Sequence, residues 1–165
     1  MRSGDIRFVA VAVLLALISC RPYPPVGWTA YTISNSLVVW LPPTYQMLPS
    51  GDGEPRFADR HHSAYLERVP ARTLSEPWLV SRSTREGSLI VGKRTTDTIS
   101  VRGRQLVVER AVGGGLPRMP EQQRLIAVHI PLNALSGAVL YSAYEGDGDR
   151  TLIAIAGTVE LTADP

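Results

Sequence analysis

The sequence predicts an α+β domain that is mostly β, an antiparallel sheet with one or two short helices packed on it, preceded by a cleavable signal peptide. Three observations support this prediction. Most apolar stretches after residue 28 are short and β-rich. Glycine and proline clusters separate these stretches as turns do. The apolar stretch at the start of the chain is too short to cross a bilayer as a helix.

The first twenty residues, MRSGDIRFVAVAVLLALISC, have the organisation of a secretory signal. Arg2 and Arg7 give a basic start, and residues 8–18 carry no charge. This run is about a dozen residues long, whereas a membrane-spanning helix needs ~20. A basic start followed by a short apolar run is typical of a signal peptide rather than of an anchor helix.

The end of this run, Leu17-Ile18-Ser19-Cys20, resembles the lipobox of bacterial lipoproteins. The resemblance implies that the Cys20 thiol takes a diacylglyceryl group, which palmitate labelling would detect, and that residues 1–19 are cleaved. It also implies that Arg21 permits transfer to the outer membrane. The expected location is the bacterial cell envelope, with the domain lipid-anchored and facing the periplasm or at the outer membrane. The alternative is a buried cysteine behind an uncleaved strand.

The expected mature chain has a proline-rich tether at residues 20–27 and a single domain at 28–165. Removing Arg2, Arg7 and Asp5 leaves 15 basic and 14 acidic residues, so net charge argues against a nucleic-acid partner. Cys20 is the only cysteine, which excludes a disulfide framework. The remaining length is sufficient for one hydrophobic core.

The first half of the domain predicts two strands and then a stretch with two interpretations. WTAYTI (28–33) alternates, and SLVVWLPP (36–43) is a continuous apolar run, typical of a strand covered on both faces and stopped by its prolines. Ser34-Asn35 suits a tight turn between them, and PSGDGEP (49–55) predicts a loop. FADRHHSAYLERV (57–69) fits either a helix or an edge strand, and the prolines of PARTLSEPW (70–78) end any helix there.

The second half predicts more strands and one helix. The strands are SLIVGKR (88–94), DTISVR (97–102), RQLVVERAV (104–112), RLIAVHIPL (124–132), GAVLYSAYE (137–145) and a final TVEL, with a hairpin at Gly103 and a loop at 113–123. Asp149 can cap a helix over 150–156, and Gly157 suits a left-handed helix stop. A strand through LIAIA (152–156) is the competing interpretation.

This order of elements resembles PsbP-like domains, in which helices pack on an antiparallel sheet. The resemblance rests on the strand ending in prolines (38–43), the VRGRQLVVERA hairpin (101–111), the RLIAVHIPL strand and the final helix and strand. It implies the fold and no chemistry, and the segment 57–86 departs from it.

Two groups of side chains are candidate metal ligands. The first is Asp59, His61, His62 and Glu67, because imidazole and carboxylate groups bind zinc. A strand would place Asp59 and His61 on one face, and a helix would place Asp59 and His62 there, so either supplies only two ligands. A solvated polar loop is the simpler interpretation, and no metal is expected.

The second group is Glu145, Asp147 and Asp149, which alternate as calcium ligands do. Arg150 stands where the glycine of such a loop is required, and Ala156 stands where its closing glutamate is required. A turn followed by a helix cap is therefore the simpler interpretation of this group too. His129, inside an apolar strand, is expected to be packed and hydrogen-bonded.

The sequence contains no motif of a known enzyme class, such as G-x-S-x-G, H-E-x-x-H or a phosphate-binding loop. We therefore expect an envelope lipoprotein with a non-catalytic binding or structural role, no cofactor, an envelope protein as a possible partner, and interface tyrosines among Tyr31, Tyr45, Tyr141 and Tyr144. The alternative is a lipid-anchored hydrolase or small-ligand binder whose site is assembled from Asp59, His61, His62 and His129. A pocket with convergent histidine and carboxylate groups would favour the alternative, and a filled core without a cleft would favour the first.

Overall fold

The computed structural model describes residues 25–33, 36–48, 55–60, 62–80, 94–113, 123–144 and 147–162. The signal peptide, the lipobox with Cys20, Arg21 and nearly all of the strand expected at 88–94 lie outside the described residues, and so do His61 and Glu145. In the described part no helix is long and apolar enough to span a membrane.

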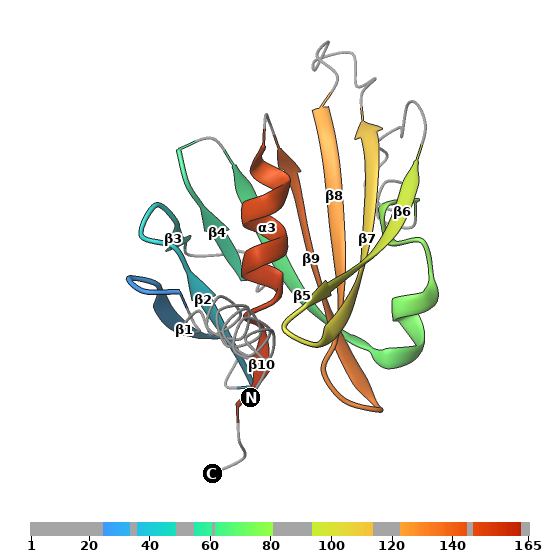
Figure 1. The fold of residues 1–165 in the computed structure, drawn as a ribbon, viewed down its shortest axis with the longest axis horizontal. Coiled ribbons are helices and arrows are strands. Elements are labelled where there is room, and N and C mark those ends of the chain that lie inside the picture. The colour runs from blue at the N-terminus through green and yellow to red at the C-terminus, as the bar shows by residue number, and fades with distance from the viewer. Residues whose placement is uncertain are drawn as a thin grey trace, which may run out of the picture.

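Two antiparallel sheets make up the described fold (Figure 1). The smaller sheet has the order β1-β2-β10, and the larger has the order β3-β4-β5-β9-β8-β7-β6. The strands are β1 (Thr29–Ile33), β2 (Leu37–Leu41), β3 (Gln46–Leu48), β4 (Arg56–Ala58), β5 (Ser63–Pro70), β6 (Thr95–Val101), β7 (Arg104–Gly113), β8 (Gln123–Pro131), β9 (Ser136–Tyr144) and β10 (Glu160–Leu161). The helices are a 3-10 helix, η1 (Ala71–Ser75), and an α-helix, α3 (Gly148–Ala156). The predicted class, α+β and mostly β, is confirmed.

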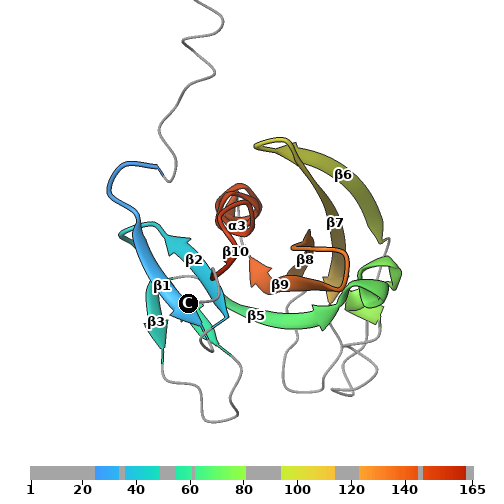
Figure 2. The same cartoon turned by 90° about the horizontal axis from the view of Figure 1, so that it is seen from below.

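The larger sheet curves around α3, which lies on its concave side, whereas η1 lies on its outer side (Figure 2). Alternate residues of the central strands β5, β7, β8 and β9 therefore enter two different cores. The main core joins α3 to the concave face and to β2, and its fully buried side chains include Leu37, Leu66, Leu106, Ile126, Leu140, Leu152 and Ile155. A smaller core on the outer face contains Val69, Trp78, Leu79, Ala111, Ala127, Val139 and Tyr141.

Several predicted pairings are confirmed by the register of the strands. β1 pairs with β2, and β8 pairs with β9. The hairpin between β6 and β7 turns at Arg102 and Gly103, whose φ angles of 56° and 76° are both left-handed. Two positive φ angles are what a two-residue hairpin turn of the favoured hand requires. The final predicted strand is present as β10, which pairs with β2.

The segment 57–69 is neither a helix nor an edge strand. It contains the end of β4, a hydrogen bond from the backbone N–H of Asp59 to the carbonyl of His62, and most of β5, which lies between β4 and β9 inside the larger sheet. The strand persists because Ala64 and Leu66 enter the main core while Val69 enters the smaller one. Burial on both faces therefore outweighs the polar appearance of the sequence.

Two further expectations are corrected. In β2 the side chains of one face, Leu37, Val39 and Leu41, are buried, whereas those of the other face, Val38 and Trp40, are only half-buried. The sequence predicts that about half of the four tyrosines are in the core, but Tyr45, Tyr141 and Tyr144 all belong to the two cores, and Tyr31 is half-buried against the main one. All four therefore contribute to packing.

The α-helix forms where it was predicted, but the residues at its two ends do not have the predicted capping roles. Asp147 occupies the N-cap position without a side-chain cap bond, and Asp149 lies inside the first turn. Gly157 has a right-handed φ of −62°, so it is not a left-handed stop. The glycine is needed for space instead, because a Cβ there would lie 2.5 Å from Cγ1 of Val101.

Candidate functional site

A carboxylate and an imidazole lie together on the outer face of the larger sheet. Glu109 shares its face of β7 with Val107 and Ala111, and His129 shares its face of β8 with Leu125 and Ala127. In the register of the two strands His129 is opposite Val107, so Glu109 and His129 are diagonal neighbours. The sheet therefore brings two polar side chains into a mainly apolar layer.

The two side chains form a buried hydrogen bond. Glu109 Oε1 lies 2.6 Å from His129 Nε2, and each side chain is only 3% exposed. An ionised carboxylate can only accept hydrogen bonds. Nε2 of His129 therefore carries a hydrogen atom and donates a hydrogen bond to Glu109. The expectation that His129 is packed and hydrogen-bonded is thus confirmed, with a partner that sequence reasoning did not name.

Glu109 also holds the chain that follows η1. The backbone N–H of Trp78 donates to Glu109 Oε1 over 2.7 Å. Burial by itself raises the pKa of Glu109. The hydrogen bonds from His129 and from the backbone of Trp78 and Leu79, together with the charge of His129, lower the pKa by more than burial raises it. The net effect is a pKa below the ordinary value of 4.5. The carboxylate is therefore ionised at neutral pH and fixes this segment against the sheet.

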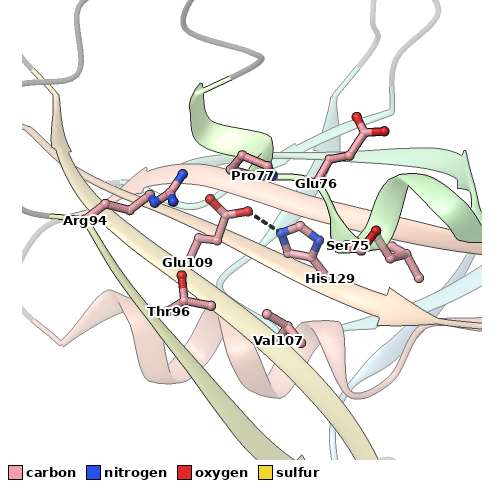
Figure 3. A pocket seen from close by; sticks show the side chains of 9 residues that line it. Ser75, Glu76, Pro77, Arg94, Thr96, Val107, Glu109 and His129 are labelled. Carbon is pink, nitrogen blue, oxygen red and sulfur yellow. Dashed lines mark hydrogen bonds and ion pairs between the residues drawn. The ribbon is translucent and has the colours of Figure 1, made fainter.

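A small pocket opens beside the pair (Figure 3). Its volume is about 150 Å³. Its lining comes from η1 and the chain after it, from β6 and the residue before it, from β7 and from β8, and consists of Leu74, Ser75, Glu76, Pro77, Arg94, Thr96, Val107, Glu109 and His129. Ser75, Glu76, Pro77, Arg94 and Thr96 are exposed and form its rim, whereas Glu109 and His129 are buried.

Two polar atoms of the pair have no hydrogen-bond partner among the described residues. They are Oε2 of Glu109 and Nδ1 of His129, and both are buried. Most buried polar atoms in folded proteins have a partner. These two atoms therefore distinguish this pocket chemically from an apolar gap in the packing.

Two candidate ligands of the first predicted metal group also meet. Asp59 Oδ1 accepts a hydrogen bond from the backbone N–H of His62 over 2.6 Å and lies 3.1 Å from its Nδ1. Tyr45 lies near the same carboxylate, and burial, followed by the charge of Asp59, raises its pKa above the ordinary value. Glu67 lies on β5, opposite Val139. Because its neighbours on the outer face pack in the smaller core, Glu67 lies away from this turn.

The second predicted group lies beside the first. A Cβ on Gly148 would be 2.8 Å from Nε2 of His62, so the start of α3 packs directly against this ring. Asp149 accepts a hydrogen bond from Arg110 over 3.3 Å, and Arg110 also binds Asp97 at 2.8 Å. The carboxylate of Asp149 therefore connects α3 to Arg110 on β7, and through Arg110 to Asp97 on β6, instead of facing His62.

No group of three or more histidine, cysteine, aspartate or glutamate side chains in the described ranges could hold a metal ion. Sequence reasoning missed Glu109 because it looked for a partner of His129 only among residues nearby in the chain. The available signal was a charged residue at a position whose neighbours two residues away, Val107 and Ala111, are apolar. Such alternation predicts a carboxylate on a buried face.

These features define a class by fold: an antiparallel sheet curved around one α-helix, with a buried carboxylate–imidazole pair on its outer face. The fold, without regard to this pair, is similar to the solution structure of cyanobacterial PsbP (CyanoP) from Synechocystis sp. PCC 6803. That similarity has a TM-score of 0.53 and 8% sequence identity, and it covers 87% of this chain and 97% of the other. At this identity the likeness establishes a PsbP-like fold and nothing about activity. No protein-family model and no curated protein matches the sequence.

Proposed function

We propose that this chain is a membrane-anchored envelope lipoprotein whose domain binds a small ligand in the pocket beside Glu109 and His129, the alternative that a pocket with a convergent histidine and carboxylate favours. The observation that carries the proposal is that two buried polar atoms, Oε2 of Glu109 and Nδ1 of His129, have no hydrogen-bond partner among the described residues. Buried polar groups at the floor of a pocket give a ligand orientation and specificity.

The position of the pocket supports this role. The described chain enters the domain beside β1, whereas the pocket lies against β6, β7 and β8, at the opposite side of the fold (Figures 1 and 2). A lipid on Cys20 would thus hold the domain by its β1 side through the tether 20–27. The pocket would then face away from the membrane, toward an envelope protein or a small ligand.

Metabolic labelling with palmitate in a bacterial host tests the anchor. The wild-type chain should incorporate label, whereas Cys20→Ser should not be labelled and should accumulate as the uncleaved precursor. Arg21→Ala is the matched control, because it alters the adjacent residue and leaves the thiol, so it should be labelled like the wild type. Equal labelling of the wild type and Cys20→Ser would disprove the anchor.

A hydrolase is the second candidate, because Ser75 lines the same pocket as His129 (Figure 3). The Ser75 hydroxyl donates to the carbonyl of Arg72 over 2.9 Å, so it would have to turn toward Nδ1 of His129 to act as a nucleophile. A fluorophosphonate probe tests this function. Labelling of the folded domain that is lost in Ser75→Ala would make the hydrolase the leading function, whereas absence of labelling supports the binding role.

A further inference from the structure

We propose that two copies of this chain join edge to edge through β6, so that their larger sheets form one continuous antiparallel sheet. β6 is the last strand of the larger sheet, and β7 is the only described strand that pairs with it. Figure 1 shows β6 beside β7 at this end of the sheet. The pairing uses the backbone of one strand and requires no ligand in the pocket.

The backbone groups that face away from the sheet belong to Thr96, Thr98 and Ser100. Val101 and Arg104 flank the two-residue turn and therefore form a hydrogen-bonded pair. Hydrogen-bonded pairs alternate with non-bonded pairs along an antiparallel ladder, so the N–H and C=O groups of the residues between point outward. Among the described residues no backbone hydrogen bond reaches these outward groups. This edge of the sheet can therefore pair with another strand.

β6 lacks the features that usually protect an exposed edge, which are short length, proline, lysine and bulges. It has seven residues, includes neither proline nor lysine, and pairs with β7 without a bulge. At the other end of the same sheet, β3 has only three residues. Asp97 is the one charged residue of β6, and its carboxylate is bound to Arg110. Of these two edges, β6 is therefore the one open to pairing.

The sequence of β6 is complementary to itself, which favours a second copy as the partner. The outward residues are arranged symmetrically about Thr98. In an antiparallel pair centred there, Thr98 lies opposite Thr98 of the second copy, and Thr96 lies opposite Ser100 of the second copy. Each hydrogen-bonded pair exchanges two N–H···O bonds, which gives about six in all. Pairs of threonine with threonine or serine across strands are favourable.

Other registers fit less well. A two-fold axis at Asp97 would place two carboxylates directly opposite each other, which is destabilising. An axis at Ile99 would place Thr96 opposite Arg102, which belongs to the turn and has a left-handed φ of 56°. About Thr98, Asp97 lies opposite Ile99 of the second copy, so no two like charges within β6 are opposite. A two-fold axis also closes the assembly at two copies.

The pairing would bring the second copy to the pocket. Thr96 lines the pocket, and its side chain lies on the same outer face as Glu109, the residue opposite it on β7 (Figure 3). Ser100 of the second copy would be the cross-strand neighbour of Thr96, with Cβ atoms ~5 Å apart. Each pocket would therefore have a residue of the other copy beside its rim.

Disulfide cross-linking of the full-length chain tests the pairing. Membranes from a bacterial host that expresses each variant are oxidised with copper phenanthroline and analysed on a non-reducing gel. Cys20 is the only native cysteine, so the wild type reports any disulfide that Cys20 forms. Thr98→Cys should give a covalent dimer, because the Cα atoms of a hydrogen-bonded pair lie ~5.5 Å apart, within the reach of a disulfide.

Single and double variants test the register. Thr96→Cys alone and Ser100→Cys alone should stay monomeric, because each cysteine would lie about 14 Å along the strand from its own counterpart. The double variant Thr96→Cys/Ser100→Cys should give the dimer, because each cysteine then lies opposite one of the other kind. Leu135→Cys is the control for random collision, since this side chain is 84% exposed and lies just before β9.

A proline tests the dependence on the backbone. In the Thr96→Cys/Ser100→Cys chain, Thr98→Pro should reduce cross-linking to the wild-type level, because proline removes an outward N–H, a position that edge strands tolerate. Thr98→Ala keeps this N–H and should leave cross-linking intact. Circular dichroism checks that both variants are folded, and the single-cysteine comparison stands if Thr98→Pro is not.

Three outcomes would refute the pairing. The first is a dimer of Thr98→Cys no more abundant than that of Leu135→Cys. The second is a dimer of Thr96→Cys alone as abundant as that of Thr98→Cys, which would exclude the register. The third is capture of a different envelope protein by Thr98→Cys in place of a second copy, which would show that the edge receives a foreign strand.

Discussion

The carboxylate of Glu109 accepts two hydrogen bonds, one from the imidazole of His129 and one from the backbone N–H of Trp78. Removing one partner of a buried charged pair costs more than the pair contributes, because the other partner stays buried without compensation. The segment after η1 contributes Trp78 and Leu79 to the smaller core. The stability of the outer face therefore depends on the ionisation of one side chain.

The first prediction is at this scale. Glu109→Gln should lower the free energy of unfolding by roughly 1.5–3 kcal/mol at neutral pH, the value of a hydrogen bond to a charged group. Urea denaturation followed by Trp fluorescence measures this loss. Glu76→Gln is the control, because this carboxylate is exposed at the rim of the same pocket.

The pH dependence follows from the direction of the shift. The folded state lowers the pKa of Glu109 below 4.5, so this group contributes stability that is present above pH 4.5 and is lost as the pH falls through the folded pKa. The stability of Glu109→Gln should therefore decline less than that of the wild type in this acid range. Parallel acid profiles for the two proteins would contradict the role given to Glu109.

At the scale of elements, α3 is positioned by two glycines that leave room for neighbouring side chains. Gly148 gives space to the ring of His62, and Gly157 gives space to Val101 at the end of β6. The ion pair between Asp149 and Arg110 adds a connection to β7. Close approach at both ends therefore fixes where the helix lies on the concave face.

Gly157→Ala tests this arrangement. Its backbone conformation accepts alanine, but the added Cβ would lie 2.5 Å from Cγ1 of Val101, a stiff β-branched side chain. Overpacking of this kind costs about 1–3 kcal/mol. In the background of Val101→Ala the same substitution should cost close to nothing, and thermal unfolding of the four proteins measures this coupling. An equal loss in both backgrounds would show that the glycine acts through its backbone.

At the scale of the whole molecule, two sheets and α3 enclose a main core, and η1 with the following segment closes a smaller one. Among the residues that the structure describes, no group of three or more histidine, cysteine, aspartate or glutamate side chains could hold a metal ion, and Asp59 and His62 are bonded to each other. The domain from Arg21 onward should therefore fold cooperatively without metal, lipid or reductant.

Melting temperatures measure this independence. An ion that binds only the folded state contributes ~2.7 kcal/mol at about a hundred times its dissociation constant. In a domain of this size this corresponds to a rise of roughly 5–10 °C. We expect millimolar calcium, stoichiometric zinc and EDTA each to change the melting temperature by less than about 2 °C. A rise of roughly 5 °C with zinc that is lost in His61→Ala/His62→Ala, or with calcium that is lost in Asp147→Asn, would restore the corresponding metal site.

The amino-acid sequence by itself determined the fold class, the strands from residue 95 onward, the hairpin at Gly103 and, with a strand left as the competing interpretation, the final helix. These features depend on local alternation and turn chemistry, which a short stretch of sequence contains in full. Only the tertiary structure decided that 57–69 supplies an internal strand, that Gly157 serves close packing, and that Glu109 meets His129. Each of these depends on which strands become neighbours and in what register, because pairing joins residues far apart in the chain and its register decides which side chains share a face.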